Sequence, residues 1–425
     1  MHWIPAGNSK KSKYSEGLVM QEVSCKYDLL LKGGHVIDPS QGINEIMDVG
    51  IKGGRIADLH PELDANESTE VTNISGKFVC PGLVDLHGHW YEGSLYGIDP
   101  HICLNHGVTT VVDAGTSGFI NFSEFRKHTI DRAQIRILAF LHISCLGLHA
   151  PFAEELRDIR YARPKETAVV IDKNRDIAVG VKIRQGSMTG NYGIEALDKA
   201  LEAANQVNLP LMVHISKGAN VPAIMKRMRP GDIITHCFQG RGDGIINQST
   251  GLVLPQIIAG RKEGIVFDVG HGCGSFSWEI TRKAFELSFY PDTISTDLHR
   301  YCVEDPFRVD LLNTMSKFLL LGMTLEEVIL KSTYNPAKVL HRDGEIGTLQ
   351  KGTVADVLVF EEEAGEFEFA DTHLRVLKGE KRLRPVQIIH NGKTLEPGSF
   401  PTKLRDLFES DYEVFRSITK ETGDL

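Results

Sequence analysis

Hydrophobic and polar positions follow two different patterns along this chain, and the pattern changes near residue 80. Between residues 27 and 78, short alternating runs such as 27–34 and 49–56 are broken by glycines, which is typical of antiparallel hairpins. After residue 80, short apolar runs alternate with helical stretches, which indicates βα units and a parallel sheet. The sequence therefore predicts a small β unit followed by a larger α/β unit.

Eight apolar runs are predicted as the strands of the α/β unit. They are residues 83–87, 108–113, 135–144, 177–184, 209–215, 232–238, 265–270 and 293–299. The clearest helix between them spans 193–204 and is rich in Ala, Leu and charges four residues apart. Two more helices are expected at 305–321 and 324–340. Eight strands with their helices over about 260 residues match the usual size of a (β/α)8 TIM barrel.

Short strands return around residues 344–360, so the small β unit would be built from both chain ends. This predicts a β-sandwich domain from residues 25–80 and 341–400, with the barrel inserted at 81–340. Residues 1–24 are polar and lysine-rich, without the apolar segment of a secretion signal, and are expected to be a flexible extension. Residues 401–425 are charged and are expected to form a helical tail.

Composition narrows the class of protein. The 425 residues are 41% hydrophobic and 24% charged, as in ordinary globular proteins, and the formal net charge is -9. We therefore expect no nucleic-acid partner, and no membrane partner because no apolar run is long enough for a span. Seven cysteines are scattered singly, which indicates a reducing compartment, most simply the cytoplasm. The expected partner is a small-molecule substrate, and a homo-oligomer is compatible with the sequence.

Candidate chemistry stands at the ends of the predicted strands. His87 and His89 are one residue apart, so on a strand both imidazoles face the same side. The pair alone is weak support for a metal, since neighbouring histidines are more often surface or hydrogen-bonded residues. Strands four, five, six and eight add further candidates, which are Lys182, His214, His236 and Asp297. All would meet at the carboxyl-terminal face of the barrel, where barrel enzymes carry their active sites.

Each candidate alone has a plainer explanation. His214 by itself would more often be a hydrogen-bonded core histidine, and Asp297 by itself could cap a helix. Lys182 is harder to explain, because a lysine in a buried strand must lose its charge or find a partner. Taken together, the residues predict a metal site formed by His87, His89, Lys182, His214, His236 and Asp297.

Several segments resemble the amidohydrolase superfamily. The resemblance lies in residues 32–39 (KGGHVIDP), 75–87 (SGKFVCPGLVDLH) and 347–356 (GTLQKGTVAD). Within that superfamily the chain is most similar to the dihydroorotase-like deacetylases, through residues 180–184, 230–238, 268–272 and 295–299.

The resemblance implies two divalent metal ions, usually zinc, bridged by a carbamate that CO2 forms on Lys182. His87, His89 and Asp297 would hold the more buried ion, and His214 and His236 the other. The implied reaction is hydrolysis of an amide or ester bond in a small acylated amino or hydroxy acid. A metal-bridging hydroxide would attack the carbonyl, and Asp297 would act as the catalytic proton carrier.

Substrate contacts and alternatives remain open at this level. Arg184 lies two residues after Lys182, so it could pair with a substrate carboxylate or form a salt bridge at the rim. His271 could bind the substrate or orient a ligand. A cyclic amidase, such as a dihydroorotase or hydantoinase relative, would use the same metals on a ring amide. A non-catalytic scaffold is disfavoured by six competent side chains, and a one-metal deaminase site by Lys182.

Overall fold

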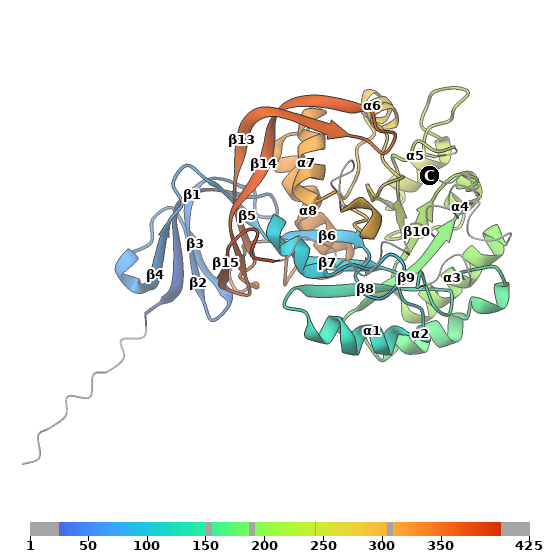
Figure 1. Cartoon of the computed structure of the whole chain (residues 1–425), viewed down its shortest axis with the longest axis horizontal. Coiled ribbons are helices and arrows are strands. Elements are labelled where there is room, and N and C mark those ends of the chain that lie inside the picture. Colours follow the sequence, from blue (N-terminus) through green and yellow to red (C-terminus); the bar gives the residue numbers. More distant parts are fainter. Residues whose placement is uncertain (1–24, 150–154, 187–191, 243, 304–308, 401–425) are drawn as a thin grey trace, which may run out of the picture.

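A computed structural model describes residues 25–149, 155–186, 192–242, 244–303 and 309–400. The predicted N-terminal extension and C-terminal tail therefore lie outside the described residues. Two sheets and nine α-helices organise the described part of the chain (Figure 1). None of these helices combines the length and apolar composition that a membrane-spanning segment needs.

Seven of the eight predicted barrel strands form one parallel sheet. The strands are β6 (Leu83–Gly88), β7 (Val108–Ala114), β8 (Arg136–His142), β9 (Ala178–Gln185), β10 (Leu211–Ile215), β11 (Ile233–Thr235) and β12 (Val266–Phe267). They neighbour one another in chain order, so each βα unit adds one strand at the same edge. The connecting helices are α1 (Phe122–His128), α2 (Pro164–Asp172), α3 (Gly193–Val207), α4 (Val221–Met225), α5 (Pro255–Lys262) and α6 (Trp278–Glu286). The mixed α/β class with a curled parallel sheet is confirmed.

The eighth predicted strand, residues 293–299, is not a regular strand. It makes only isolated parallel bridges, Asp268 with Thr293 on one side and Gly88 with Leu298 on the other. Two buried carboxylates hold the segment there. Asp268 accepts a hydrogen bond from the Thr293 hydroxyl (2.6 Å), and Asp85 accepts one from the Thr296 amide (3.0 Å). These side-chain bonds replace part of the backbone ladder, so the segment still connects both edges of the sheet.

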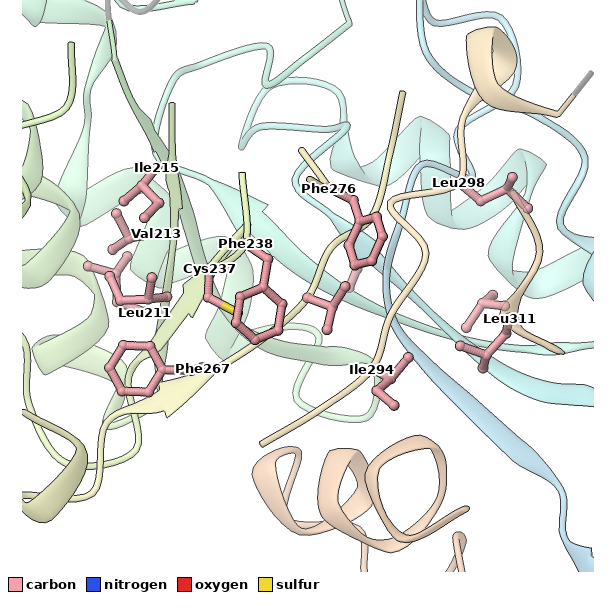
Figure 2. Packing of buried hydrophobic residues seen from close by; sticks show 14 of the residues in the cluster. Leu211, Val213, Ile215, Cys237, Phe238, Phe267, Phe276, Ile294, Leu298 and Leu311 are labelled. Carbon is pink, nitrogen blue, oxygen red and sulfur yellow. The ribbon is translucent and has the colours of Figure 1, made fainter. Parts of the chain in front are cut away.

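Alternation along the strands separates the site from the surrounding core. On β10, Leu211, Val213 and Ile215 join the large apolar cluster between sheet and helices (Figure 2). Met212 belongs instead to a second cluster on the other side of the strand. Because side chains alternate along a strand, His214 shares the face of Met212 and not that of the outer core.

The second sheet combines strands from both ends of the chain, as predicted (Figure 1). Its members are β1 (Tyr27–Asp38), β2 (Ile43–Lys52), β3 (Arg55–His60), β4 (Ser68–Asn73), β5 (Phe78–Pro81), β13 (Val357–Ala370), β14 (Val376–His390) and β15 (Lys393–Leu395). The two ends meet where β5 pairs antiparallel with β13. Its strands follow a single hydrogen-bonded path with β4 beside β1, so a sandwich of two stacked sheets stays a prediction.

Three details of the C-terminal half differ from the sequence-based prediction. Residues 305–308 of the helix expected over 305–321 lie outside the described part of the chain, and the helix described there is α7 (Leu311–Leu320), with Asp310 as its capping residue. The helix expected over 324–340 is two helices, α8 (Leu325–Ser332) and α9 (Tyr334–Val339). Pro336 explains the break, because its ring clashes with a helical carbonyl four residues earlier and it has no N–H to donate. The strands expected from residue 344 begin only at Val357.

Candidate metal centre

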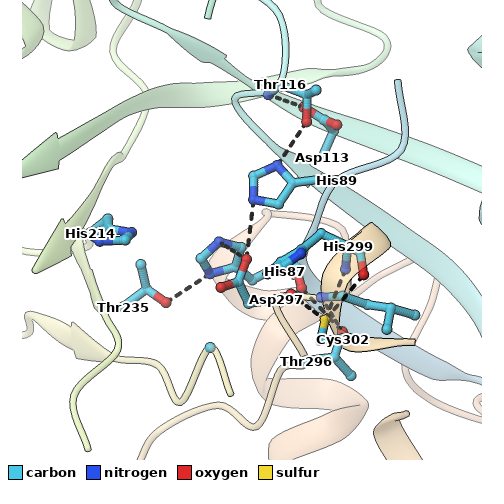
Figure 3. Close-up of polar contacts among 12 residues, drawn as sticks. His87, His89, Asp113, Thr116, His214, Thr235, Thr296, Asp297, His299 and Cys302 are labelled. Carbon is cyan, nitrogen blue, oxygen red and sulfur yellow. Dashed lines mark hydrogen bonds and ion pairs between the residues drawn. The ribbon is translucent and has the colours of Figure 1, made fainter. Parts of the chain in front are cut away.

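His87 of β6 and His89, one residue beyond the end of that strand, meet Asp297 from the segment after α6. Asp297 Oδ1 lies 3.3 Å from His87 Nε2 and 3.1 Å from His89 Nε2 (Figure 3). All three residues are buried, and among the described residues they form a group whose ligand atoms lie within 4.8 Å of one another. Two imidazoles and a carboxylate at this spacing are a suitable donor set for a divalent metal ion.

Hydrogen bonding fixes which nitrogen of His87 faces this group. The Thr235 hydroxyl donates to Asp268 Oδ2 (2.7 Å), so its oxygen accepts from His87 Nδ1 (2.8 Å). His87 is therefore protonated on Nδ1, and the lone pair on Nε2 faces Asp297. Burial holds the pKa of His87 well below its usual value, which keeps the ring neutral as a metal ligand must be.

His89 has the same arrangement, with partners in and just after β7. Its Nδ1 lies 2.8 Å from the Thr116 hydroxyl, and Thr116 in turn hydrogen-bonds to the Asp113 carboxylate (Figure 3). Burial lowers the pKa of His89 to about 3. A threonine and a carboxylate thus orient each of the two histidines, which is the supporting network typical of metal ligands.

His214 and His236 form a second pair. His236 Nδ1 donates to the Gly270 carbonyl (2.7 Å), which leaves its Nε2 lone pair 2.8 Å from His214 Nδ1. The same Nε2 lies 3.9 Å from Asp297 Oδ2, so Asp297 connects the two pairs. Burial lowers the pKa of His236 to about 4. Two ring nitrogens facing each other, with no hydrogen on His236 Nε2, fit a shared cation.

Lys182 lies beside this group on β9. Its Nζ is 3.2 Å from His87 Nε2 and 3.6 Å from the Met212 sulfur, and both groups are uncharged. The side chain is 1% exposed, and burial lowers its pKa to about 8. None of the described carboxylates forms an ion pair with this amine. A buried charged amine is costly, so burial favours the neutral form of Lys182.

Backbone conformation also shapes the centre. His236 (φ 67°) and Asp297 (φ 48°) both adopt the left-handed region, which costs a non-glycine residue about 1–3 kcal/mol. Gly270 (φ +49°) lies against His236, and a Cβ there would come within 2.3 Å of Thr235 Oγ1 and 2.8 Å of His236 Nδ1. The turn after β11 and the turn at Asp297 are therefore held in an uncommon geometry that aims their side chains at the group.

Arg184 is placed near the centre but already has a partner. Its guanidinium forms a two-pronged ion pair with Glu155, whose Oε1 lies 3.0 Å from Nε, and both side chains are buried. The pKa of Glu155 falls to about 2 although burial opposes this, because Arg184 and the nearby His142 ring, whose Nε2 lies 3.6 Å from Oε1, favour the ionised form. The sequence predicted either a contact to a substrate carboxylate or a salt bridge at the rim, and the structure shows a salt bridge, at a buried position.

His271 is committed to other contacts. Its Nδ1 donates to the Gly272 carbonyl (2.8 Å), and Lys317 of α7 donates to its Nε2 (2.7 Å). Its ring stacks on Phe276 at 4.6 Å. A substrate contact through His271 would require one of these bonds to break, so that role stays a prediction.

The structure adds residues that the sequence-based reasoning missed. Thr116, Thr235, Asp113 and Asp268 orient the histidines, and Glu155 holds Arg184. Asp113 and Asp268 could have been noticed, since each is a carboxylate at a predicted strand end. The threonines and Glu155 carried no comparable signal, because their partners are far away in the sequence.

Comparison with known proteins agrees with this geometry. The amidohydrolase family model matches residues 282–395. A deacetylase of Agrobacterium fabrum is 34% identical over 360 residues, which is 83% of this chain and 88% of the relative. A crystal structure of an adenine deaminase has a TM-score of 0.81 at 30% identity, covering 87% of this chain and 100% of that one. A crystal structure of a dihydroorotase has a TM-score of 0.79 at 31% identity, covering 87% and 99%.

A relative that is 34% identical over 83% of this chain is similar enough to decide the family. The resemblance seen in the sequence is confirmed: the chain belongs to the amidohydrolase superfamily, in its dihydroorotase-like group.

Proposed function

We propose that this hydrolase is a metal-dependent deacetylase, which cleaves the amide or ester bond of a small acylated amino or hydroxy acid. The observation that carries the proposal is the joining of His87, His89 and His236 through the single carboxylate of Asp297. The similarity to a protein named deacetylase supports the hydrolytic removal of an acetyl group.

The donor set supports two divalent ions, with zinc as the expected metal. His87, His89 and Asp297 would hold one ion, and His214 and His236 the other, with Lys182 contributing to both as a carbamate. The hydrogen bonds of Thr235, Thr116 and the Gly270 carbonyl leave a lone pair on three imidazoles facing the same region. Bound divalent ions would polarise the scissile carbonyl and lower the pKa of an attacking water.

Asp297 is the residue assigned to proton transfer. Its two oxygens face different histidines, so the carboxylate spans the region where the scissile bond would lie. It would accept the proton that the attacking water loses and return it to the leaving nitrogen or oxygen. Arg184 would bind the substrate carboxylate with guanidinium hydrogens that Glu155 does not occupy.

The surroundings of Lys182 support the proposed carbamate. The neutral amine adds to the carbon of CO2 and loses one proton, which leaves one negative charge on the new carboxylate. This anion would place two oxygens among neutral imidazoles, at the position where Lys182 Nζ hydrogen-bonds to His87 and Met212. Cations on either side would compensate its charge.

We propose that the chain is divided into the domains that the sequence predicts. Residues 81–340 would be a TIM barrel, and residues 25–80 with 341–400 a small β-sandwich domain. We propose a cytoplasmic enzyme, compatible with a homo-oligomer, that uses neither nucleic acid nor a membrane as a partner.

A metal count combined with a substrate screen tests this function. The purified protein should contain two divalent ions per chain and release acetate from some N-acetyl or O-acetyl carboxylates. A scaffold would contain well under one ion per chain. Two ions without hydrolysis of any acylated acid would contradict the deacetylase proposal.

A cyclic amidase is the second candidate, favoured by the structural similarity to a dihydroorotase. It would use the same residues to open a ring amide. Opening of dihydroorotate at a rate above that of the acetylated acids would select this alternative.

A further inference from the structure

We propose that His299 and Tyr96 form a substrate-positioning wall, which together with Arg184 binds the carboxylate of the acylated acid. The inference rests on the proposed function and gives roles to Tyr96, which lies outside the motifs, and to His299, which lies in the segment 295–299 but is not a predicted metal ligand. His299 lies two residues after Asp297 and is buried, and its ring centroid is 6.1 Å from that of His89. It is therefore next to the reacting centre.

The hydrogen-bonding state of His299 follows from its neighbour. The backbone N–H of Tyr301 donates to His299 Nδ1 (3.3 Å), so the hydrogen of the neutral ring is on Nε2. His299 Nε2 lies 3.8 Å from the thiol of Cys273, a residue that is partly exposed. The N–H edge of His299 thus faces the Cys273 sulfur, which is a weak acceptor, so a ligand oxygen that replaced this contact would receive a stronger hydrogen bond.

Tyr96 continues the same wall. Its ring lies 5.3 Å from that of His299 and 5.6 Å from that of His89, and it is only partly buried. Tyr96 also hydrogen-bonds to Arg184. A guanidinium has only donors, so the phenol oxygen accepts and its own hydrogen points away from Arg184.

Three neighbouring side chains beside the centre therefore carry hydrogen-bond donors, which are the imidazole of His299, the phenol of Tyr96 and the guanidinium of Arg184. Glu155 occupies the Nε edge of Arg184, which fixes the plane of the guanidinium and leaves the opposite edge toward Tyr96. Convergent donors with one positive charge suit an anion with two oxygens, and a carboxylate fits this description. The chemical class of substrate is then an acyl compound with a carboxylate close to the scissile bond.

A structural role for His299 is the rival explanation, because the same ring caps the short helix η6 (Arg300–Cys302). Two substitutions separate the roles. His299→Asn keeps an acceptor near the position of Nδ1 for the Tyr301 amide but removes the Nε2 donor. His299→Gln places an amide N–H near the position of Nε2.

The experiment compares paired substrates on the metal-loaded enzyme: an N-acetyl amino acid and the same compound without its carboxylate. We expect His299→Asn to raise KM for the acid at least 10-fold, to leave kcat/KM for the carboxylate-free analogue within 2-fold, and to retain the wild-type metal content. His299→Gln and Tyr96→Phe should give smaller increases in KM for the acid. His128→Ala, an exposed histidine on α1, serves as the control and should match wild type.

Binding gives a readout apart from turnover. Calorimetric titration with the free amino acid product should show weaker binding to His299→Asn than to wild type, and partial recovery in His299→Gln. Equal losses on both substrates, or unchanged product binding, would overturn the proposal. If wild type hydrolyses no acetylated compound at all, the proposed function is wrong. If wild type hydrolyses the substrates with and without the carboxylate equally well, only the substrate-positioning wall is wrong.

Discussion

Thr235 and His87 share a hydrogen bond of 2.8 Å between a hydroxyl and an imidazole nitrogen, 148 positions apart in the chain. Because the Thr235 hydroxyl donates its hydrogen to Asp268, its oxygen can only accept a hydrogen bond from His87. This contact decides that Nε2 of His87 keeps its lone pair for a metal.

Replacing Thr235 with valine should weaken metal binding. The change removes the acceptor for His87 Nδ1 at nearly constant volume, and losses of supporting bonds of this kind typically cost 10- to 100-fold in metal affinity. Competition with a chelator measures the effect. Thr235→Ser, which keeps the hydroxyl, is the matched control and should retain wild-type affinity. Equal affinities for the valine and serine variants would contradict the assigned role.

Asp297→Asn should abolish turnover while metal remains bound. The amide keeps an oxygen ligand near His89 but cannot accept the transferred proton, so kcat should fall by about 10²–10⁴-fold. Metal analysis and kcat for an acetylated acid are measured on the same preparation. Turnover at the wild-type rate would remove Asp297 from proton transfer.

Lys182→Ala should lower the metal content and the rate together, because the shared anionic ligand is lost. A short carboxylate such as formate, added at high concentration, should restore part of the activity by occupying the same space. In wild type, growth with ¹³C-labelled bicarbonate should give a carbamate carbon signal by NMR that is absent from the variant. A wild-type spectrum without this signal at full metal content would contradict the modification.

Lys317 should make the folding stability depend on pH. Burial lowers its pKa from 10.5 to about 7, against smaller opposing effects of Asp310 and Asp371. Between these two values the unfolded chain holds a proton that the folded protein does not, so the free energy of unfolding rises with pH. We expect the free energy of unfolding of wild type to rise, relative to that of Lys317→Met, by up to about 1.4 kcal/mol for each pH unit above 7.

Urea unfolding of both proteins at pH 7 and pH 9 measures this difference. Methionine has nearly the same length but has no proton to titrate, so the stability of this variant should lack the pH dependence that Lys317 contributes. Parallel pH dependences of the two proteins would show that the Lys317 amine stays charged in the folded state.

The sequence by itself determined the parallel strands, the mixed α/β class and the family, and it named the six candidate ligands. These follow from local signals. Strand periodicity places His87 with His89 and Lys182 with Arg184, and the ends of parallel strands lie at one edge of a sheet. The break at Pro336 was equally local, and a proline inside the predicted helix was sufficient warning of it.

Only the tertiary structure decided how those side chains are held and what competes for them. Thr235 of β11 and Thr116 just after β7 fix the tautomers of His87 and His89. Glu155, in a loop 29 positions away, forms an ion pair with Arg184. Such partners depend on distances across the fold, which no periodicity in the chain encodes. The eighth strand shows the same limit, because buried carboxylates hold it where regular backbone pairing was expected.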